Sequence, residues 1–517
     1  MKKKLAIWGT GNVCTQVMGS CPWLVPVKLI DNNLEKSGMF LQGIEIIHPS
    51  KIMDWQDLFV VLAMDNYIGV KRQLEEKGLV EKENFVWYRE WQDECEIESI
   101  LEEAEDFLCK IEDYEKEFHG YRIMFSDFLA FDKGVCGYVN KWSEDAGKLM
   151  LLSEAMWVSP ERKSSLHVPI IRLPKVLLHN FYLRSGDIRK EITAENIKDA
   201  QPKPYMEEVK ENLKMGYPDM AANYECVICY YADEIVRKIL SCWKPSQVIL
   251  WNAFYGFHMI VRSVCLEEGI PIKYMEFGNI PGTIIVEELG QMGESWPARY
   301  PQEFMEIPVS GKEYEDAELL VQELQKSRLN RNEQPRNNVL SAIKSKLKKG
   351  RPIVFFAGQN DNASGMQPYT ENTWKFHSPI FKSSDEAAVF LAEVCERNEW
   401  NYIYKPHPMM TGTCDNAIIP ASTIFVEDAD IHDLIDLSDV VVTILSTVSY
   451  SALIRKKPVV MLGYTQLKGK GCTFEAFEKE YIEKEISAAL VNNTDEHMYQ
   501  SFIKHVAQLN RYYAIGR

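Results

Sequence analysis

Residues 401–408 read NYIYKPHP, and residues 440–463 read VVVTILSTVSYSALIRKKPVVMLG. The first segment predicts a short strand that ends where two prolines flank His407, because proline cannot continue a β ladder. The apolar run over 440–444 is typical of a buried parallel strand, and the residues after it have the pattern of a helix. Another strand is predicted over 458–462. We therefore expect three strand ends at one edge of a parallel sheet, where open α/β sheets bind ligands.

Polar side chains follow these strand ends. Lys405 and His407 stand after the first strand, and Ser446 and Thr447 stand after the second, where the predicted helix begins. Cationic groups, hydroxyls and the free N–H groups of a helix start all suit a phosphate-bearing ligand. His407 taken alone is more often structural than functional, and Ser446 and Thr447 could serve only as a helix cap. Their expected convergence favours a binding role.

A family resemblance rests on the same stretch. The motifs KPHP, SDVVVT, STxxxxALxxxKPVVxLG and GKGxT follow one another in this order, where x is any residue. This order resembles the C-terminal half of the bacterial capsule polysaccharide biosynthesis proteins, which include Kdo-transferase-like enzymes. The resemblance implies that His407, Ser446 and Thr447 contact the phosphate of a donor nucleotide. Ser451 stands where many members have Glu, so the ribose contact assigned to that Glu does not carry over.

A loop rich in hydrogen-bonding groups, residues 358–365, follows a predicted strand over 353–357. Its position after a strand suits a contact to a donor or an acceptor. We therefore place Gln359 with Lys405 among the residues expected to bind the donor nucleotide.

A second segment resembles the N-terminal half of the same family. A predicted strand over 272–275 leads into Glu276 and the sequence FGNIPGT, and Glu287 opens an acidic-x-x-Gly element. The resemblance implies a GT-B-like pair of Rossmann-type domains that face each other across a cleft. A carboxylate after a strand suits the proton of an acceptor hydroxyl, so Glu276 is the expected acid-base group. Glu287 is the second choice, and Asp361 and Asp439 on the other half are rivals.

The first 90 residues predict a separate Rossmann-like domain. A strand over 4–8 enters Gly9-Thr10-Gly11, and a second strand ends at Asp31, the acidic position of a dinucleotide fingerprint. Cys14 stands where that fingerprint has Gly or Ala. The stretch resembles the nucleotide-sugar-binding domain of bacterial sugar acyltransferases, which implies ligand contacts at Gly9, Gly11 and Asp31. In the alternative interpretation the glycines only permit a tight turn and nothing binds.

The expected class is therefore α/β, with an additional N-terminal Rossmann-like domain before the GT-B-like pair. The domains are predicted at 1–90, 91–120, 121–335 and 336–517. The second of these is one acidic amphipathic helix over residues 94–117, in which apolar residues recur at helical spacing. It reads as a linker packed on a neighbouring domain.

Composition limits the classes of molecule that the chain is expected to bind. The chain has 517 residues, a net charge of −17 and 12 cysteines without regular spacing. The negative charge argues against nucleic acid, which recruits basic surfaces. The chain opens with MKKK and then a strand, with no signal-peptide pattern, so we expect a cytoplasmic protein with reduced thiols. A basic cluster over 344–351 could meet the inner face of the membrane as a peripheral contact.

The leading functional hypothesis is a metal-independent glycosyltransferase of bacterial surface or capsular polysaccharide synthesis. It would use a nucleotide-activated sugar, with CMP-Kdo or another CMP-sugar as the candidate donor, and a glycan or lipid-linked glycan as acceptor. Lys405 and His407 would offset charge on the leaving phosphate, so neither a metal nor a cofactor is expected. Two alternatives remain open: a CDP-alditol polyol-phosphate transferase, and a non-catalytic nucleotide- or carbohydrate-binding protein.

Overall fold

A computed structural model describes the chain in thirteen segments. They are residues 3–20, 26–64, 66–81, 83–88, 97–126, 133–145, 147–153, 165–177, 203–216, 223–329, 339–410, 419–492 and 495–513.

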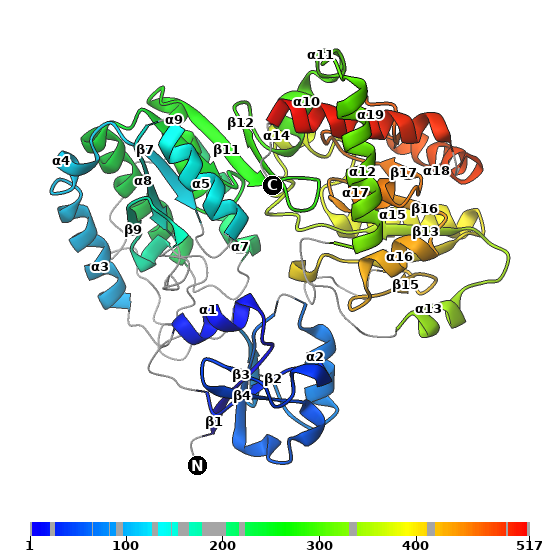
Figure 1. Cartoon of the computed structure of the whole chain (residues 1–517), viewed down its shortest axis with the longest axis horizontal. Helices are drawn as coiled ribbons and strands as arrows, with labels where there is room; N and C mark the ends of the chain where they lie inside the picture. Colours follow the sequence, from blue (N-terminus) through cyan, green and yellow to red (C-terminus); the bar gives the residue numbers. More distant parts are fainter. Residues whose placement is uncertain are drawn as a thin grey trace. The chain divides into compact units, whose positions relative to one another are not determined.

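Three six-stranded sheets, each accompanied by helices, make up the described structure (Figure 1). By internal contacts the chain divides into two compact units, Met1–Trp251 with Gly256–Ile272 and Asn252–Tyr255 with Lys273–Arg517. The predicted α/β class, with three Rossmann-type sheets, is confirmed. The four domain boundaries given above stay a prediction.

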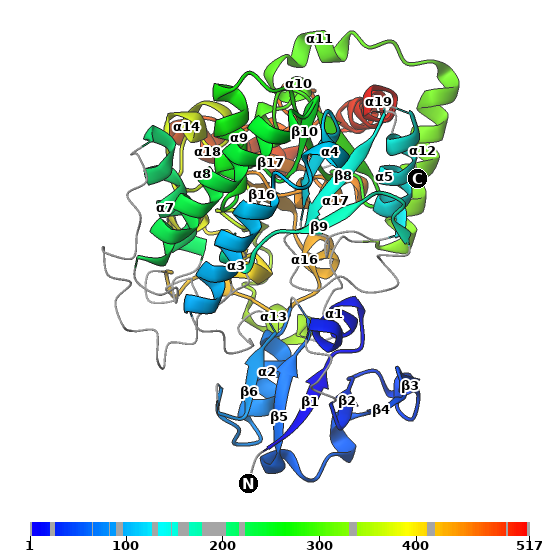
Figure 2. The ribbon, with the colours of Figure 1, turned by 90° about the vertical axis from the view of Figure 1, so that its left-hand side faces the viewer.

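The first sheet has the order β3-β4-β2-β1-β5-β6, and Figure 2 shows its strands side by side. All its neighbours are parallel except β3 and β4. The elements are β1 (Lys4–Trp8), α1 (Asn12–Ser20), β2 (Lys28–Ile30), β3 (Phe40–Leu41), β4 (Ile44–Ile47), β5 (Leu58–Leu62), α2 (Ile68–Glu75) and β6 (Phe85–Trp87). The strand predicted over 4–8 is confirmed to the residue.

The second sheet has the order β12-β11-β10-β7-β8-β9. Its strands are β7 (Arg122–Ser126), β8 (Leu149–Ser153), β9 (Ile170–Arg172), β10 (Gln247–Trp251), β11 (Ile272–Phe277) and β12 (Ile284–Glu287). The helices of this region are α3 (Ile97–Lys110), α4 (Glu115–Phe118), α5 (Lys133–Asp145), α7 (Pro204–Gly216), α8 (Tyr224–Trp243) and α9 (His258–Glu267).

The single helix predicted over 94–117 is wrong. Residues 94–96 lie outside the described residues, and the rest forms α3 and α4 with a turn between them. The indole of Trp243 donates a hydrogen bond to the carbonyl of Ile111 at 2.8 Å, at the turn. The carbonyls at the end of a helix have no partner within the helix. Here a buried side chain 132 residues away donates to the carbonyl of Ile111, so the helix can end at this turn without leaving that carbonyl unpaired. Apolar spacing along one segment could not have shown that partner.

The third sheet is entirely parallel, with the order β15-β14-β13-β16-β17-β18. Its strands are β13 (Ile353–Ala357), β14 (Asn401–Lys405), β15 (Ile424–Phe425), β16 (Val440–Thr443), β17 (Val459–Met461) and β18 (Phe474–Glu475). The helices between and after them are α14 (Glu371–Phe376), α15 (Ser384–Arg397), α16 (Ile431–Leu437), α17 (Val448–Ile454), α18 (Ile482–Val491) and α19 (Glu496–Tyr513). Five further elements precede this sheet: η7 (Met292–Glu294), α10 (Trp296–Arg299), α11 (Pro301–Met305), α12 (Gly311–Ser327) and α13 (Leu340–Lys346).

The core of the third sheet lies on both of its faces. Alternate residues of a strand point to opposite faces, so Phe355 and Val441 join one apolar cluster while Phe356 and Val442 join the other. The first cluster also holds the buried side of α12, which explains why residues 311–327 pack with the C-terminal sheet. A strand buried on both faces reads as a continuous apolar run, as predicted for 440–444.

Candidate functional site

The candidate site lies at the carboxyl edge of the third sheet. Ala357 at the end of β13 is level with Lys405 of β14 and with Thr443 of β16. Thr443 is in turn level with Met461 of β17. Four parallel strands therefore end together, and the residues that follow them leave the sheet at one edge.

His407 lies on a half-buried loop directly after β14, as predicted. The 3-10 turn Pro408–Met410 follows it, and the N–H of Met410 donates to the carbonyl of His407 at 2.8 Å. The flanking prolines end the strand and fix the direction in which the chain leaves the sheet. The imidazole is therefore carried by a short constrained loop at the edge.

Lys405 is buried more deeply than its predicted role requires, with 5% of its surface exposed. Its ammonium donates to the carbonyl of Glu427 at 2.6 Å, after β15. Burial lowers the pKa of Lys405 to about 8, although Asp428, Glu427 and Asp430 act to raise it. The positive charge is thus held beneath the edge, where it is lost more easily than that of an ordinary lysine.

Ser446 and Thr447 differ in what their hydroxyls do. The hydroxyl of Ser446 accepts a hydrogen bond from the N–H of Val448 at 3.3 Å, so it caps the short helix α17. Thr447 occupies the N-cap position itself, but its side chain makes no capping bond. Both residues are partly exposed. Thr447 is therefore the hydroxyl that the helix does not use.

Gln359 is a buried residue whose side chain stabilises the loops at this edge of the sheet. Its carbonyl oxygen accepts from the N–H of Leu445 at 2.7 Å, and its amide nitrogen lies 3.3 Å from the hydroxyl of Ser364. The side chain is 4% exposed. It joins the loop after β13 to the loop that carries Ser446, which fits positioning of the hydroxyls better than a direct ligand contact.

Asp361, the alternative acid-base candidate, lies in the same loop after β13 and is hydrogen-bonded there. Its carboxylate accepts from the N–H of Ser384 at 2.9 Å and from the hydroxyl of Ser384 at 2.6 Å, at the start of α15. Burial raises the pKa of Asp361 to about 6, although these hydrogen bonds act to lower it. The carboxyl is therefore occupied in holding the helix start.

The two predicted acid-base candidates lie on the β11–β12 hairpin. Glu276 is partly exposed and lies inside β11 opposite Ile285, so the strand continues past it to Phe277. Glu287, at the end of β12, is 3% exposed and accepts from the N–H of Trp296 at 3.0 Å. Burial raises the pKa of Glu287, although its hydrogen bonds act to lower it.

A partly buried polar relay ties this hairpin to the third sheet, and sequence reasoning missed it. The amide of Asn279 donates to Gln466 at 2.8 Å, the amide of Gln466 donates to the phenol oxygen of Tyr513 at 2.8 Å, and that phenol donates to Glu287 at 3.1 Å. Asn279 follows β11, and Gln466 follows β17. The relay therefore brings the segment after Glu276 to the carboxyl edge of the third sheet. No local motif signals pairs so distant in sequence.

The predicted ligand-binding residues of the N-terminal domain make contacts with other residues of that domain. Gly9 has φ +107°, and a Cβ there would lie 2.7 Å from the carbonyl of Ala63, so this position requires glycine for the turn itself. Asp31 accepts from Lys36 at 2.9 Å and also from the hydroxyl of Thr10. Burial acts to raise the pKa of Asp31, but these hydrogen bonds hold it below its ordinary value.

Gly11 is exposed just before α1, and Cys14 is buried within that helix. Burial raises the pKa of the Cys14 thiol to about 12. The structure thus brings Gly9, Gly11 and Asp31 to one end of the first sheet. It also gives Gly9 and Asp31 structural partners of their own.

The described residues hold neither a cluster of metal ligands nor a helix that could span a membrane. No group of three or more histidine, cysteine, aspartate or glutamate side chains there is arranged to hold a metal ion. In the same segments, no helix combines the length and the apolar character needed to cross a membrane.

Comparison with known proteins shows that the C-terminal part matches a family model. Residues 310–512 match the model of the family described as capsule polysaccharide biosynthesis protein. The resemblance inferred from KPHP and the motifs after it is therefore confirmed in that segment. Comparison with curated proteins found no match.

Similar solved structures include two of KpsC from Thermosulfurimonas dismutans. The beta Kdo 2,7 transferase is 17% identical, with a TM-score of 0.34 over 58% of this chain and 96% of the other. The beta Kdo 2,4 transferase is 15% identical, with a TM-score of 0.35 over 51% and 87%. The UDP-GlcNAc 2-epimerase of Methanocaldococcus jannaschii is 12% identical, with a TM-score of 0.31 over 74% and 97%.

Proposed function

We propose that this protein is a glycosyltransferase of capsular or surface polysaccharide synthesis, and that the third sheet holds its nucleotide-sugar donor. The observation that carries the proposal is the common edge at which β13, β14, β16 and β17 end, inside the segment that matches the capsule family. Nucleotides bind at such an edge in open α/β sheets. A CMP-sugar, with CMP-Kdo as first candidate, is the donor that the family relationship favours.

In this proposal the donor phosphate lies between His407 and Thr447. The histidine can donate a hydrogen bond or carry a positive charge, and the threonine hydroxyl is not used for capping. Lys405 supplies a buried positive charge beneath the edge, where a low dielectric strengthens its attraction for an anion. Gln359 and Ser446 hold the loops that carry these groups.

As the leaving phosphate gains charge, fixed donors at this edge would stabilise it without reorganising. The acceptor would be held by the half of the GT-B-like pair that contains the second sheet. The acceptor is a glycan or lipid-linked glycan in this account. Peripheral contact with the inner face of the membrane, through the basic cluster over 344–351, belongs to the same proposal.

Glu276 is the proposed general base for the acceptor hydroxyl. The residue is partly exposed, and the chain just after it joins the third sheet through Asn279. Glu287 remains the second choice, but its carboxylate is buried and accepts hydrogen bonds from two other segments, α10 and the end of α19. That environment suits a structural anchor better than a group that must exchange protons with a substrate.

Release of CMP from CMP-Kdo, with and without an oligosaccharide acceptor, tests this assignment. Glu276→Gln is expected to lower transfer about a hundredfold or more while leaving CMP binding unchanged. Glu303→Gln, at an exposed position of α11, is the matched control and is expected to retain full transfer. A large loss in Glu287→Gln with normal transfer in Glu276→Gln would move the role to Glu287. Normal transfer in both would refute the proposed base.

A further inference from the structure

The residues between β10 and α9 belong to a different compact unit from the two elements that they connect. The chain passes from the first unit into the second at Asn252 and returns to the first at Gly256. We call Asn252–Tyr255 the connecting segment. Its hydrogen bonds and its packing show which part of the second unit receives it.

The side chain of Asn252 makes hydrogen bonds in two directions. Its oxygen accepts from the N–H of Phe254 at 3.0 Å, and its nitrogen donates to the carbonyl of Ala363 at 3.1 Å. The backbone of Asn252 has φ +62°, a conformation that asparagine adopts more readily than most residues. Ala363 lies in the loop after β13 that also contains Gln359. One side chain therefore shapes the connecting segment and fastens it to that loop.

A further hydrogen bond of the connecting segment is buried. The N–H of Ala253 donates to the side-chain oxygen of Gln291 at 2.7 Å, and both residues are 2% exposed. Gln291 directly precedes η7. Because a buried N–H without a partner is costly, this bond holds the segment in one place. The connecting segment is thus fixed to η7 as well as to the loop after β13.

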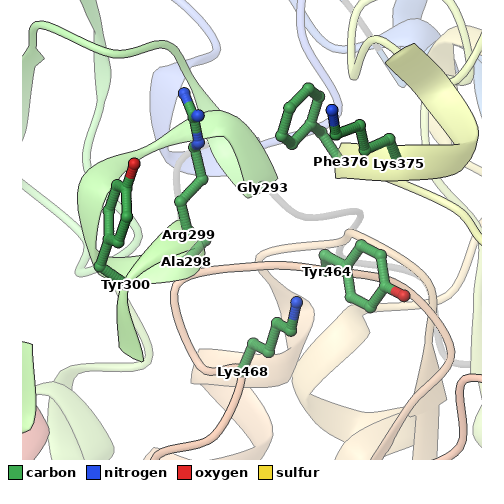
Figure 3. A pocket seen from close by; sticks show the side chains of 8 residues that line it. All are labelled: Gly293, Ala298, Arg299, Tyr300, Lys375, Phe376, Tyr464 and Lys468. Carbon is green, nitrogen blue, oxygen red and sulfur yellow. The ribbon is translucent and has the colours of Figure 1, made fainter. Parts of the chain in front are cut away.

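The ring of Phe254 packs at the carboxyl edge of the third sheet. A Cβ at Gly365, near the end of the loop after β13, would lie 2.9 Å from this ring. The imidazole of His377 is nearly perpendicular to the ring, with 4.9 Å between the ring centres. His377 follows α14, and its carbonyl accepts from the N–H of Tyr464 in the loop after β17 at 2.7 Å. Figure 3 shows Phe376, at the end of α14, near Tyr464. The ring of Phe254 therefore meets segments that are held at the edge of the candidate site.

The loop after β13 joins these contacts to the residues expected to bind the donor phosphate. The N–H of Met366 donates to the carbonyl of Asp361 at 3.1 Å, so the loop is closed on itself. At its start, the side chain of Gln359 accepts from the N–H of Leu445 at 2.7 Å, directly before Ser446. The packing of the connecting segment on this loop therefore bears on the position of the hydroxyls after β16.

From these contacts we propose that Asn252 and Phe254 are positioning residues for the donor phosphate site. By ordering the loop after β13, they keep Gln359 in place to hold the loop that carries Ser446 and Thr447. The inference rests on the proposed function, because it concerns the same phosphate site. It assigns to that site two residues from outside the segment 310–512 that matches the family model.

Asn252→Gly in the full chain tests the contribution of this side chain, because glycine adopts the positive φ without strain. Loss of the bond to Ala363 is expected to speed hydrogen exchange of the amides of residues 364–366 at least tenfold. It is also expected to weaken CMP binding, measured by calorimetry, at least fivefold. Phe254→Ala is expected to change both quantities in the same direction. Unchanged CMP affinity or unchanged exchange in Asn252→Gly would overturn the inference.

Asn223→Gly is the matched control. Asn223 also has a positive φ, +67°, and it is exposed at the start of α8. Its side chain makes no capping hydrogen bond among the described residues. The same substitution there is expected to leave both the exchange of residues 364–366 and the affinity for CMP as in the wild type. An equal loss of CMP affinity in the two variants would overturn the inference.

A measurement on the wild type avoids any effect of substitution on folding. If the connecting segment and the phosphate site are coupled, CMP must stabilise the segment in return. CMP is therefore expected to slow hydrogen exchange of the Ala253 and Phe254 amides at least threefold. If CMP binds without slowing them, the inference fails while the proposed function stands. If the wild type binds no CMP, the proposed function fails, and the inference fails with it.

Discussion

The phenol of Tyr513 donates a hydrogen bond to the carboxylate of Glu287 at 3.1 Å, across 226 residues of sequence. The same phenol oxygen accepts from Gln466 at 2.8 Å. The end of α19 is thereby fastened both to β12 and to the loop after β17. The carboxylate of Glu287, which a sequence motif proposes as a catalytic candidate, is buried in the structure and accepts the hydrogen bond that anchors the end of α19.

Loss of this anchor should destabilise the second compact unit. Tyr513→Phe is expected to lower the free energy of unfolding by about 1–3 kcal/mol. The substitution removes the hydroxyl to which the buried side chains of Glu287 and Gln466 are hydrogen-bonded. Urea unfolding followed by tryptophan fluorescence measures the change. Tyr512→Phe is the control with a smaller expected effect, since its phenol lies 3.4 Å from Glu287. Equal stability of wild type and Tyr513→Phe would show that the relay contributes nothing.

The glycine of the N-terminal turn gives a second stability test. Gly9→Ala is expected to lower the free energy of unfolding by about 1–3 kcal/mol, because the alanine would need a positive φ and its Cβ would lie too close to the carbonyl of Ala63. Gly43→Ala is the matched control: its φ is +81°, but a Cβ there meets nothing within 4 Å. Thermal unfolding separates the contact from the backbone strain. If both substitutions cost the same, the close approach to Ala63 does not matter.

Asp361 predicts a pH dependence of stability. Its pKa is about 6 in the folded protein and 3.8 ordinarily, so the folded state binds the proton more tightly. Its contribution to stability is therefore present in full below about pH 4 and is lost as the pH rises through 6. Between pH 4.5 and pH 7.5, the wild type should lose about 2 kcal/mol relative to Asp361→Asn. Urea midpoints at the two pH values measure this, and a difference independent of pH would contradict it.

Lys405 predicts a pH dependence of nucleotide binding. Its pKa of about 8 means that its charge is mostly lost between pH 7 and pH 9. The phosphate of CMP, with a second pKa of about 6, is already ionised over this range. CMP affinity is therefore expected to fall about tenfold from pH 7 to pH 9 in the wild type and to stay level in Lys405→Met. The same fall in both proteins would assign the titration to another group.

Local patterns predicted the strands well and the side-chain partners poorly. The apolar runs over 4–8 and 353–357 are strands to the residue, because a run buried on both faces leaves its mark in sequence. The helix predicted over 94–117 was wrong because its interruption involves Trp243, far along the chain. The strand ends that carry His407 and Thr447 were predictable from breaks in the apolar runs. The burial of Glu287 depends on α19, and no nearby residue announces it.

The central claim is that the carboxyl edge of the third sheet binds a nucleotide through His407, and calorimetric titration with CMP tests it most directly. His407→Ala is expected to weaken CMP binding at least tenfold, which is about 1.4 kcal/mol. His497→Ala, at an exposed histidine of α19, is the matched control and should bind like the wild type. A folded His407→Ala protein with unchanged CMP affinity, or a wild type that binds no CMP, would contradict the account.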